Sequence, residues 1–233
     1  MELFYSPGAG GKYHTIEGEE ASHIVRVLRK KRGDRFFLTN GKGGLFEVEI
    51  VETGKKFCKV AILKEVKTDP ERRRHLHIAL SPVKNIRRFE WFLEKATEIG
   101  IDMITPLLCE HSERQVIKPE RLQKVIVSAA KQSLKTVFPV LNPMVDFKTF
   151  VSTGDFAGQK FIAVCRDDEM IPLKEAIKDT KDGAVILIGP EGGFSKGEIA
   201  LAKQRGFLPV SLGGSRLRTE TAGIVACTVF NVC

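Results

Sequence analysis

Two glycine-rich stretches near the C-terminus contain the residue types of ligand-binding loops. The first is GPEGG, residues 189–193, and it directly follows the apolar run Val185–Ile188. The second, SLGGSRLRTETAG (residues 211–223), also follows an apolar run, and its Thr219 is the predicted N-cap of the last helix. Paired glycines permit positive φ and close approach to the backbone, whereas Pro190 fixes φ and removes a donor. Each stretch alone is also typical of an ordinary turn, but together they indicate a shared ligand site.

The expected ligand of these loops is not a phosphate. G-x-x-x-x-G-K-[ST] is absent, because in GAGGKY (residues 8–13) the Gly-Lys pair is followed by Tyr13. GPEGGF does not match G-x-G-x-x-G, which argues against a Rossmann-type nucleotide enzyme. Ser195 and Glu198 form an S-x-x-E capping box that satisfies the next helix internally. A nucleoside without phosphates fits better, since backbone amides can read the edge of a base.

The elements that position these loops alternate between strand and helix. We expect strands at 75–83, 103–109, 160–165, 184–189 and 207–212, and helices at 85–99, 120–135, 195–205 and from about 220. Such alternation predicts a parallel sheet with helices on its faces. Ligands bind outside the carboxyl ends of parallel strands, which is where both glycine-rich loops fall.

The first 66 residues have a different period. LFEVEIVE alternates with Phe46, Val48 and Ile50 on one face, and a hairpin turn, NGKGG, precedes it. A helix is predicted at Glu19–Leu28 within what reads as a small β-barrel. Residues 67–74 are charged and lack a period, as in a linker. The predicted division is therefore a small domain over residues 1–70 and an α/β domain over 71–233.

The charge distribution indicates a polyanionic partner. The net charge is +8, and residues 26–35 contain six basic residues in ten. Basic residues complement the dipole at a helix C-terminus, but this cluster is denser than capping requires. Nucleic acid is therefore favoured over a merely solvated helix end. The candidate RNA-binding residues are Arg26, Arg29, Lys30, Lys31, Lys84 and Arg88.

The five cysteines are scattered and form no CxxC pair. This predicts a reducing, cytoplasmic location without disulfides and without a metal site. No apolar run approaches 18 residues and the first 12 residues lack an apolar leader segment, so no membrane association is expected.

Several motifs carry a resemblance to one family. LIGPEGGFSKGEI followed by LGGSRLRTETA resembles the RsmE family, the 16S ribosomal RNA (uracil-N3) methyltransferases of the SPOUT superfamily. ASHIVRVLR, KNIRRFEWFLEKATEIGI, ITPLLCEHSER and AAKQSLK are similar to further family elements along nearly the whole chain. One departure is Leu134-Lys135, where many members have Gly-Arg, which leaves a charge without the planar guanidinium.

The resemblance implies a fold, a cofactor and partners. The fold is a SPOUT α/β domain with a C-terminal trefoil knot, preceded by a PUA-like β-barrel. The cofactor is S-adenosylmethionine, and the protein is a homodimer that acts on 16S rRNA, assembled in the small subunit. The residues expected to bind the cofactor are Leu187, Ile188, Gly189, Pro190, Glu191, Gly192, Gly193, Leu212, Gly213, Leu217, Arg218 and Thr219.

Methylation of uracil N3 requires an unpaired base and loss of the N3 proton. Arg218 is the candidate that stabilises the developing anion, and its alternative role is to brace loop carbonyls. Glu220 either accepts a proton or favours the helix N-terminus. Glu191 either contacts substrate or bridges loops, and Trp91 is expected on the polar side of its helix. The alternative function is a non-catalytic RNA-binding or ribosome-assembly factor with the same fold.

Overall fold

The structure, a computed structural model, describes residues 2–66, 74–156, 158–165, 167–178, 180 and 182–233. The chain forms two compact units, one comprising 1–71 and 127–138 and the other 72–126 and 139–233. The predicted linker 67–74 lies outside the described residues except for Arg74. Each unit is described by itself.

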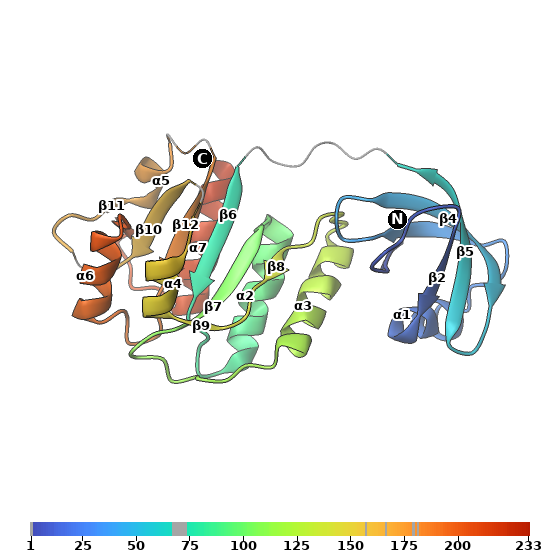
Figure 1. The fold of residues 1–233 in the computed structure, drawn as a ribbon, viewed down its shortest axis with the longest axis horizontal. Coiled ribbons are helices and arrows are strands. Elements are labelled where there is room, and N and C mark those ends of the chain that lie inside the picture. The colour runs from blue at the N-terminus through green and yellow to red at the C-terminus, as the bar shows by residue number, and fades with distance from the viewer. Residues whose placement is uncertain (1, 67–73, 157, 166, 179, 181) are drawn as a thin grey trace. The chain divides into compact units, whose positions relative to one another are not determined.

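The first unit contains a five-stranded sheet, of which Figure 1 labels β2, β4 and β5, and the strand order is β1-β3-β4-β5-β2. Phe46, Val48 and Ile50 are buried, which confirms the predicted alternation. β1 runs parallel to β3, and the other neighbours are antiparallel. The strands are β1 (Leu3–Tyr5), β2 (Tyr13–Glu17), β3 (Arg35–Thr39), β4 (Leu45–Thr53) and β5 (Phe57–Glu65).

The helix predicted at Glu19–Leu28 is only partly α-helical. α1 (Gly18–Ser22) continues as the π-helix η1 (His23–Val27), in which the Leu28 amide donates to the His23 carbonyl at 3.0 Å. Arg29 follows with a φ of 53°. The wider turn ends the helix one residue earlier than predicted and begins the basic segment in a left-handed conformation.

Residues 127–138 belong to the first unit although they lie far along the chain. The Lys131 ammonium lies 2.8 Å from both carboxylate oxygens of Glu20, and the Gly43 amide donates to the Thr136 carbonyl at 2.9 Å. The Tyr5 and Phe138 rings have centroids 4.8 Å apart.

The second unit is built on an eight-stranded sheet in which every described pair of strands is parallel, as predicted. The order is β11-β13-β10-β12-β6-β7-β8, and β9 pairs with β7; Figure 1 labels all of these strands except β13. The strands are β6 (His75–Leu80), β7 (Met103–Leu108), β8 (Val140–Leu141), β9 (Val145–Asp146), β10 (Gln159–Ala163), β11 (Ile171–Pro172), β12 (Gly183–Ile188) and β13 (Leu208–Ser211).

Helices cover both faces of this sheet. β12 is buried along its length, with Ile186 in the core that includes α2 and α7 and Leu187 in the core that includes α4 and α6. Six apolar residues in succession are therefore explained by burial from two sides. The helices are α2 (Ile86–Ile99), α3 (Pro119–Gln132), α4 (Phe147–Thr153), α5 (Leu173–Ala176), α6 (Lys196–Gln204) and α7 (Thr219–Val232), and α3 passes into the first unit from residue 127.

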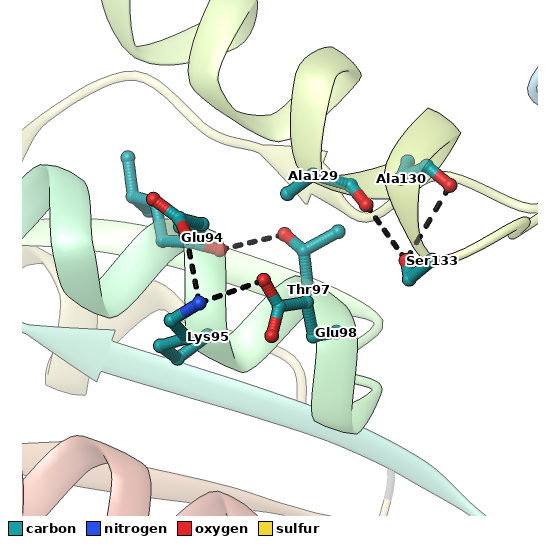
Figure 2. Close-up of polar contacts among 8 residues, drawn as sticks. Glu94, Lys95, Thr97, Glu98, Ala129, Ala130 and Ser133 are labelled. Carbon is teal, nitrogen blue, oxygen red and sulfur yellow. Dashed lines mark hydrogen bonds and ion pairs between the residues drawn. The ribbon is translucent and has the colours of Figure 1, made fainter.

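The last turns of α2 and α3 are closed by local contacts (Figure 2). In α2, the Lys95 ammonium lies 2.7 Å from Glu94 and 2.9 Å from Glu98. At the end of α3, the Ser133 hydroxyl donates to the Ala129 carbonyl at 2.7 Å. Leu134 then takes a φ of 58°, a conformation that usually selects glycine.

Candidate functional site

The first glycine-rich loop is a tight turn at the end of β12. The Gly193 amide donates to the Pro190 carbonyl at 2.8 Å, and Gly193 has a φ of 75°. The Ser195 side chain accepts from the Glu198 amide, while the Glu198 carboxylate accepts from the Ser195 amide at 2.8 Å. The predicted capping box is confirmed, so the N-terminus of α6 is satisfied without a ligand.

The segment that follows β7 holds this loop from one side. The Nδ1 atom of His111 lies 3.0 Å from the Gly193 carbonyl oxygen. The Glu110 amide donates to the Glu198 carboxylate at 2.9 Å. At Gly192, a Cβ atom would stand 3.0 Å from the Cβ of His111, so the two backbones approach closely there. A side chain at position 192 would therefore press on His111.

The segment after β6 holds the same loop from another side. The Glu191 carboxylate accepts from the Lys84 amide at 3.1 Å, and the Arg114 guanidinium donates to the Val83 carbonyl at 3.1 Å. The Lys84 ammonium pairs with Glu113 at 2.8 Å, and the hydrogen bond to that carboxylate raises the pKa of Lys84. Glu191 thus bridges to the β6 segment, and Lys84 carries an acidic partner.

The second glycine-rich loop, residues 212–218, is held much less. Among the described residues, the amides of 213–217 make no hydrogen bond. A Cβ atom added at Gly213 or Gly214 would meet no atom within 4 Å. Residues 213–216 are exposed. This loop therefore presents unpaired backbone donors and open space.

One hydrogen bond joins the two loops. The Thr219 hydroxyl donates to the Gly189 carbonyl at 3.0 Å, and Thr219 is buried. The prediction that Thr219 is the N-cap of the last helix is wrong, because Arg218 occupies that position without a side-chain cap. The hydroxyl is engaged with the other loop, which leaves it unable to cap its own helix.

The two predicted catalytic residues differ in their surroundings. Arg218 is exposed, and within the described part of the chain its guanidinium has no hydrogen-bond or ion-pair partner. The Glu220 side chain is only 9% exposed, and its Oε1 lies 3.8 Å from the Nε of Arg88 on α2. Glu220 also stands in the first turn of α7, where a carboxylate favours the helix dipole. Arg218 is thus free to meet a ligand, whereas Glu220 is engaged.

The predicted RNA-binding residues fall into both units. In the first unit, the Arg26 guanidinium donates to the Lys55 carbonyl at 3.1 Å, and the Lys30 ammonium pairs with Glu2 at 2.6 Å. Arg29 and Lys31 are exposed. Lys84 and Arg88, in the second unit, each have an acidic partner. Arg26, Arg29 and Lys31 are consequently the cations of this set without an acidic partner in the described chain.

Two further absences concern only the described residues. No three of their His, Cys, Asp or Glu side chains gather as a metal ion would require. None of their helices is both long and apolar enough to cross a bilayer.

Comparison with known proteins places these loops in a family. Residues 70–231 match the RNA methyltransferase domain family, and residues 16–63 match the RNA methyltransferase PUA domain. Ribosomal RNA small subunit methyltransferase E of Synechocystis sp. is 31% identical over 93% of this chain and 72% of its own length. The chain belongs to the ribosomal RNA small subunit methyltransferase E family.

Solved structures share the whole fold. The probable rRNA-methyltransferase of Porphyromonas gingivalis is 41% identical with a TM-score of 0.88, covering 97% of this chain and 95% of its own. The small subunit methyltransferase E of Neisseria gonorrhoeae, bound to S-adenosyl methionine, is 27% identical with a TM-score of 0.86, covering 97% and 95%. The predicted architecture, a PUA-like domain and an α/β methyltransferase domain, is confirmed.

The sequence pattern did not single out the residues after β7 that support the first loop, either directly or through the segment after β6. Glu110, His111 and Arg114 lie in CEHSER, directly after a buried strand. A run of polar residues at the carboxyl end of a parallel strand was the available signal.

Proposed function

We propose that this protein uses S-adenosylmethionine to methylate N3 of a specific uridine in the 16S rRNA of the small ribosomal subunit. The observation that carries the proposal is the Thr219–Gly189 hydrogen bond, which brings the two glycine-rich loops to one place. Membership of the small subunit methyltransferase E family supports the reaction class.

The second loop fits a nucleoside cofactor. Its unpaired amides can bond to the edge of an adenine, and the open space at Gly213 and Gly214 admits a ring against the backbone. The capping box at Ser195 satisfies the N-terminus of α6, so the helix that follows the first loop offers no phosphate site. We propose that residues 187–193 and 212–219 hold the cofactor, which supplies an activated methyl group when bound.

Arg218 is the group that we propose acts on the uracil. Loss of the N3 proton places negative charge on the base, and an unpaired guanidinium at the N-terminus of α7 opposes that charge. Glu220 orients this end of the site through its contact with Arg88. The target uridine must be unpaired, because base pairing occupies N3.

We also propose the finer features of the family for this chain. The C-terminal segment forms a trefoil knot, which the return of α7 to the end of β12 supports. The protein is a homodimer located in the cytoplasm, and its PUA-like domain, with the segment Arg26–Lys31, supplies RNA affinity. The proposed division lies near residue 70, with residues 127–138 packing in the first unit. Sedimentation velocity tests the dimer.

A tritiated-methyl transfer assay tests the reaction itself. Purified protein is incubated with labelled cofactor and either deproteinised 16S rRNA or assembled small subunits, and the modified base is identified by mass mapping. Label at N3 of one uridine is the expected result. A ribosome-assembly factor without catalytic activity would bind either substrate and transfer no label.

A further inference from the structure

An aromatic side chain stands on the solvent side of the first unit. Tyr13 on the edge strand β2 is 53% exposed, whereas Ile16 on the opposite face of that strand is 1% exposed. The core does not need this ring, since it lies on the side of the sheet that points away from the core. Thr15, two residues along, is exposed on the same side.

Two ammonium groups lie beside the ring. The Nζ atoms of Lys12 and Lys59 are 5.8 Å and 5.7 Å from the Tyr13 ring centroid. Lys59 comes from β5, where it pairs in register with Thr15. Neither lysine has an ion-pair partner among the described residues. Distances near the outer limit of a cation–π contact leave both groups able to turn toward an anion.

Two carboxylates on β4, the strand on the other side of β5, are already paired. Glu47 pairs with Lys64 at 3.0 Å, and Glu49 pairs with Arg35 at 3.0 Å. Glu52, also on β4, lies in register with Lys59 and is exposed. Glu17 stands four residues from Tyr13 on β2, about 13 Å along an extended strand. The two lysines beside the ring therefore face one nearby carboxylate, Glu52, and the local charge is net positive.

The turn before β2 exposes its backbone. Gly8 and Gly11 have φ values of 85° and 74°, and no atom lies within 4 Å of a Cβ added at either. This is the GAGGK segment that lacks the context of a phosphate loop. Its backbone is open to a ligand that already contacts Lys12 and Tyr13.

We propose that Lys12, Tyr13 and Lys59 form a stacking site for an unpaired nucleotide of the substrate RNA, other than the uridine that is methylated. The ring stacks on the base, and the two lysines contact the phosphates on either side of it. A ring flanked by two cations fits a nucleic acid better than a peptide, which would need apolar pockets along β2. The proposal rests on the proposed function in taking RNA as the substrate.

Fluorescence anisotropy with a labelled single-stranded RNA of about 12 nucleotides, and with its duplex, tests this site. Tyr13→Thr keeps strand propensity but removes the ring, and it should weaken single-strand binding by roughly 5- to 100-fold. Tyr13→Phe should stay within about twofold, because the π face remains. Thr15→Ala, on the same strand and face, is the matched control and should bind normally.

The lysines are tested by the salt dependence. The double variant Lys12→Gln, Lys59→Gln should reduce the slope of log K against log salt by about 1.4 for single strands. This measurement remains decisive if Tyr13→Thr fails to fold. Cofactor binding by calorimetry should be unchanged in every variant.

Several outcomes would overturn the stacking site. They are normal RNA affinity in Tyr13→Thr, equal losses in Tyr13→Thr and Thr15→Ala, an unchanged salt slope, or a change in sedimentation that marks a protein interface. The methylation assay separates this failure from that of the proposed function. Wild-type protein that transfers no methyl group refutes the function, whereas normal transfer with an inert Tyr13 refutes only the stacking site.

Discussion

The loop after β12 and the loop after β13 meet at the Thr219–Gly189 hydrogen bond, but they are supported differently. The first is held by Glu191, by His111 and by the capping box at Ser195. The second has unpaired amides over 213–217 in the described chain. The contrast indicates different roles. The first loop is held in place before a ligand binds, and the second loop gains its hydrogen bonds from the ligand.

Substitution of Arg218, at the end of the second loop, gives the sharpest test of this difference. Arg218→Ala should raise the barrier of the methylation step by about 2–4 kcal/mol, because the cation that opposes the developing anion is lost. Single-turnover transfer at saturating cofactor measures it. Arg218→Lys should recover part of the rate, since a point charge replaces the planar fork.

Cofactor affinity and melting temperature on the same variants decide between the two roles of Arg218. A catalytic role leaves both near wild type. Loss of both, with normal transfer once the site is saturated, would show that Arg218 braces the loop instead.

The stability of the second unit should depend on pH. His77 on β6 contacts the Thr105 hydroxyl on β7 at 2.7 Å, so it joins the two strands that carry the bracing segments. Burial lowers the pKa of His77 from 6.5 to about 4. The unfolded chain therefore binds this proton first, and stability is full above about pH 6.5 and falls as the pH drops toward 4.

The lowering of the His77 pKa from 6.5 to about 4 corresponds to roughly 3 kcal/mol. Urea denaturation across this pH range measures the loss, and His77→Gln should flatten it. His75→Gln, at an exposed position on the same strand, is the control and should keep the slope. If the stability of His77→Gln depends on pH as steeply as that of the wild type, His77 is not the group responsible.

The two loops should also respond differently to added side chains. Gly214 has no positive φ and no atom near a Cβ, so Gly214→Val should fold normally and lower cofactor affinity at least about tenfold. Gly193 has a positive φ, so Gly193→Val should lose stability of about 1–3 kcal/mol before any effect on the ligand. Calorimetry and thermal melts measure both. Equal cofactor affinity in Gly214→Val and wild type would place the ligand elsewhere.

Some elements of the fold are predictable from the sequence and others are not. The strands of the second unit were predicted because burial from two sides leaves long apolar runs such as β12. The elements β8, β9 and β11 have two residues each, too few to show a period. The short edge strands β1 and β2 lie on either side of a glycine-rich turn, and their sequence pattern is hard to separate from that turn.

Site residues were predictable only where chemistry left a local signature. Glycine pairs and the capping box are readable in the sequence, whereas the Thr219 hydroxyl bonds across 30 residues to Gly189. Its role depends on tertiary placement, and the same holds for His111. The packing of 127–138 in the first unit depends on contacts such as Lys131 with Glu20, 111 residues apart.

The first loop should lose stability when the capping carboxylate of Glu198 is removed. Glu198 accepts from the amides of both Ser195 and Glu110, so Glu198→Ala should cost about 1–2 kcal/mol of the free energy of unfolding. Glu120→Ala removes an exposed carboxylate from the first turn of α3 and is the matched control for the dipole alone. Similar losses in the two variants would mean that the cap does not hold the loop.

The smallest expected effect concerns why glycine stands at a position: because the backbone there has a positive φ, or because a ligand needs the space. A positive φ marks a need of the protein's own backbone, and Leu134 meets that need without being glycine: its φ is 58° and its side chain is 44% exposed. The Lys135 amide donates to the Ala130 carbonyl at 2.8 Å, which closes a Schellman turn around it. Leu134→Gly relieves the strain of the left-handed conformation but raises the conformational entropy of the unfolded chain. The free energy of unfolding should therefore rise by no more than about 1 kcal/mol. Leu134→Ala loses the same contacts without relief, and it should be less stable than Leu134→Gly by about 1 kcal/mol in urea denaturation. If the alanine variant matches the glycine variant, the left-handed turn is not strained, and positive φ does not identify where this chain requires glycine.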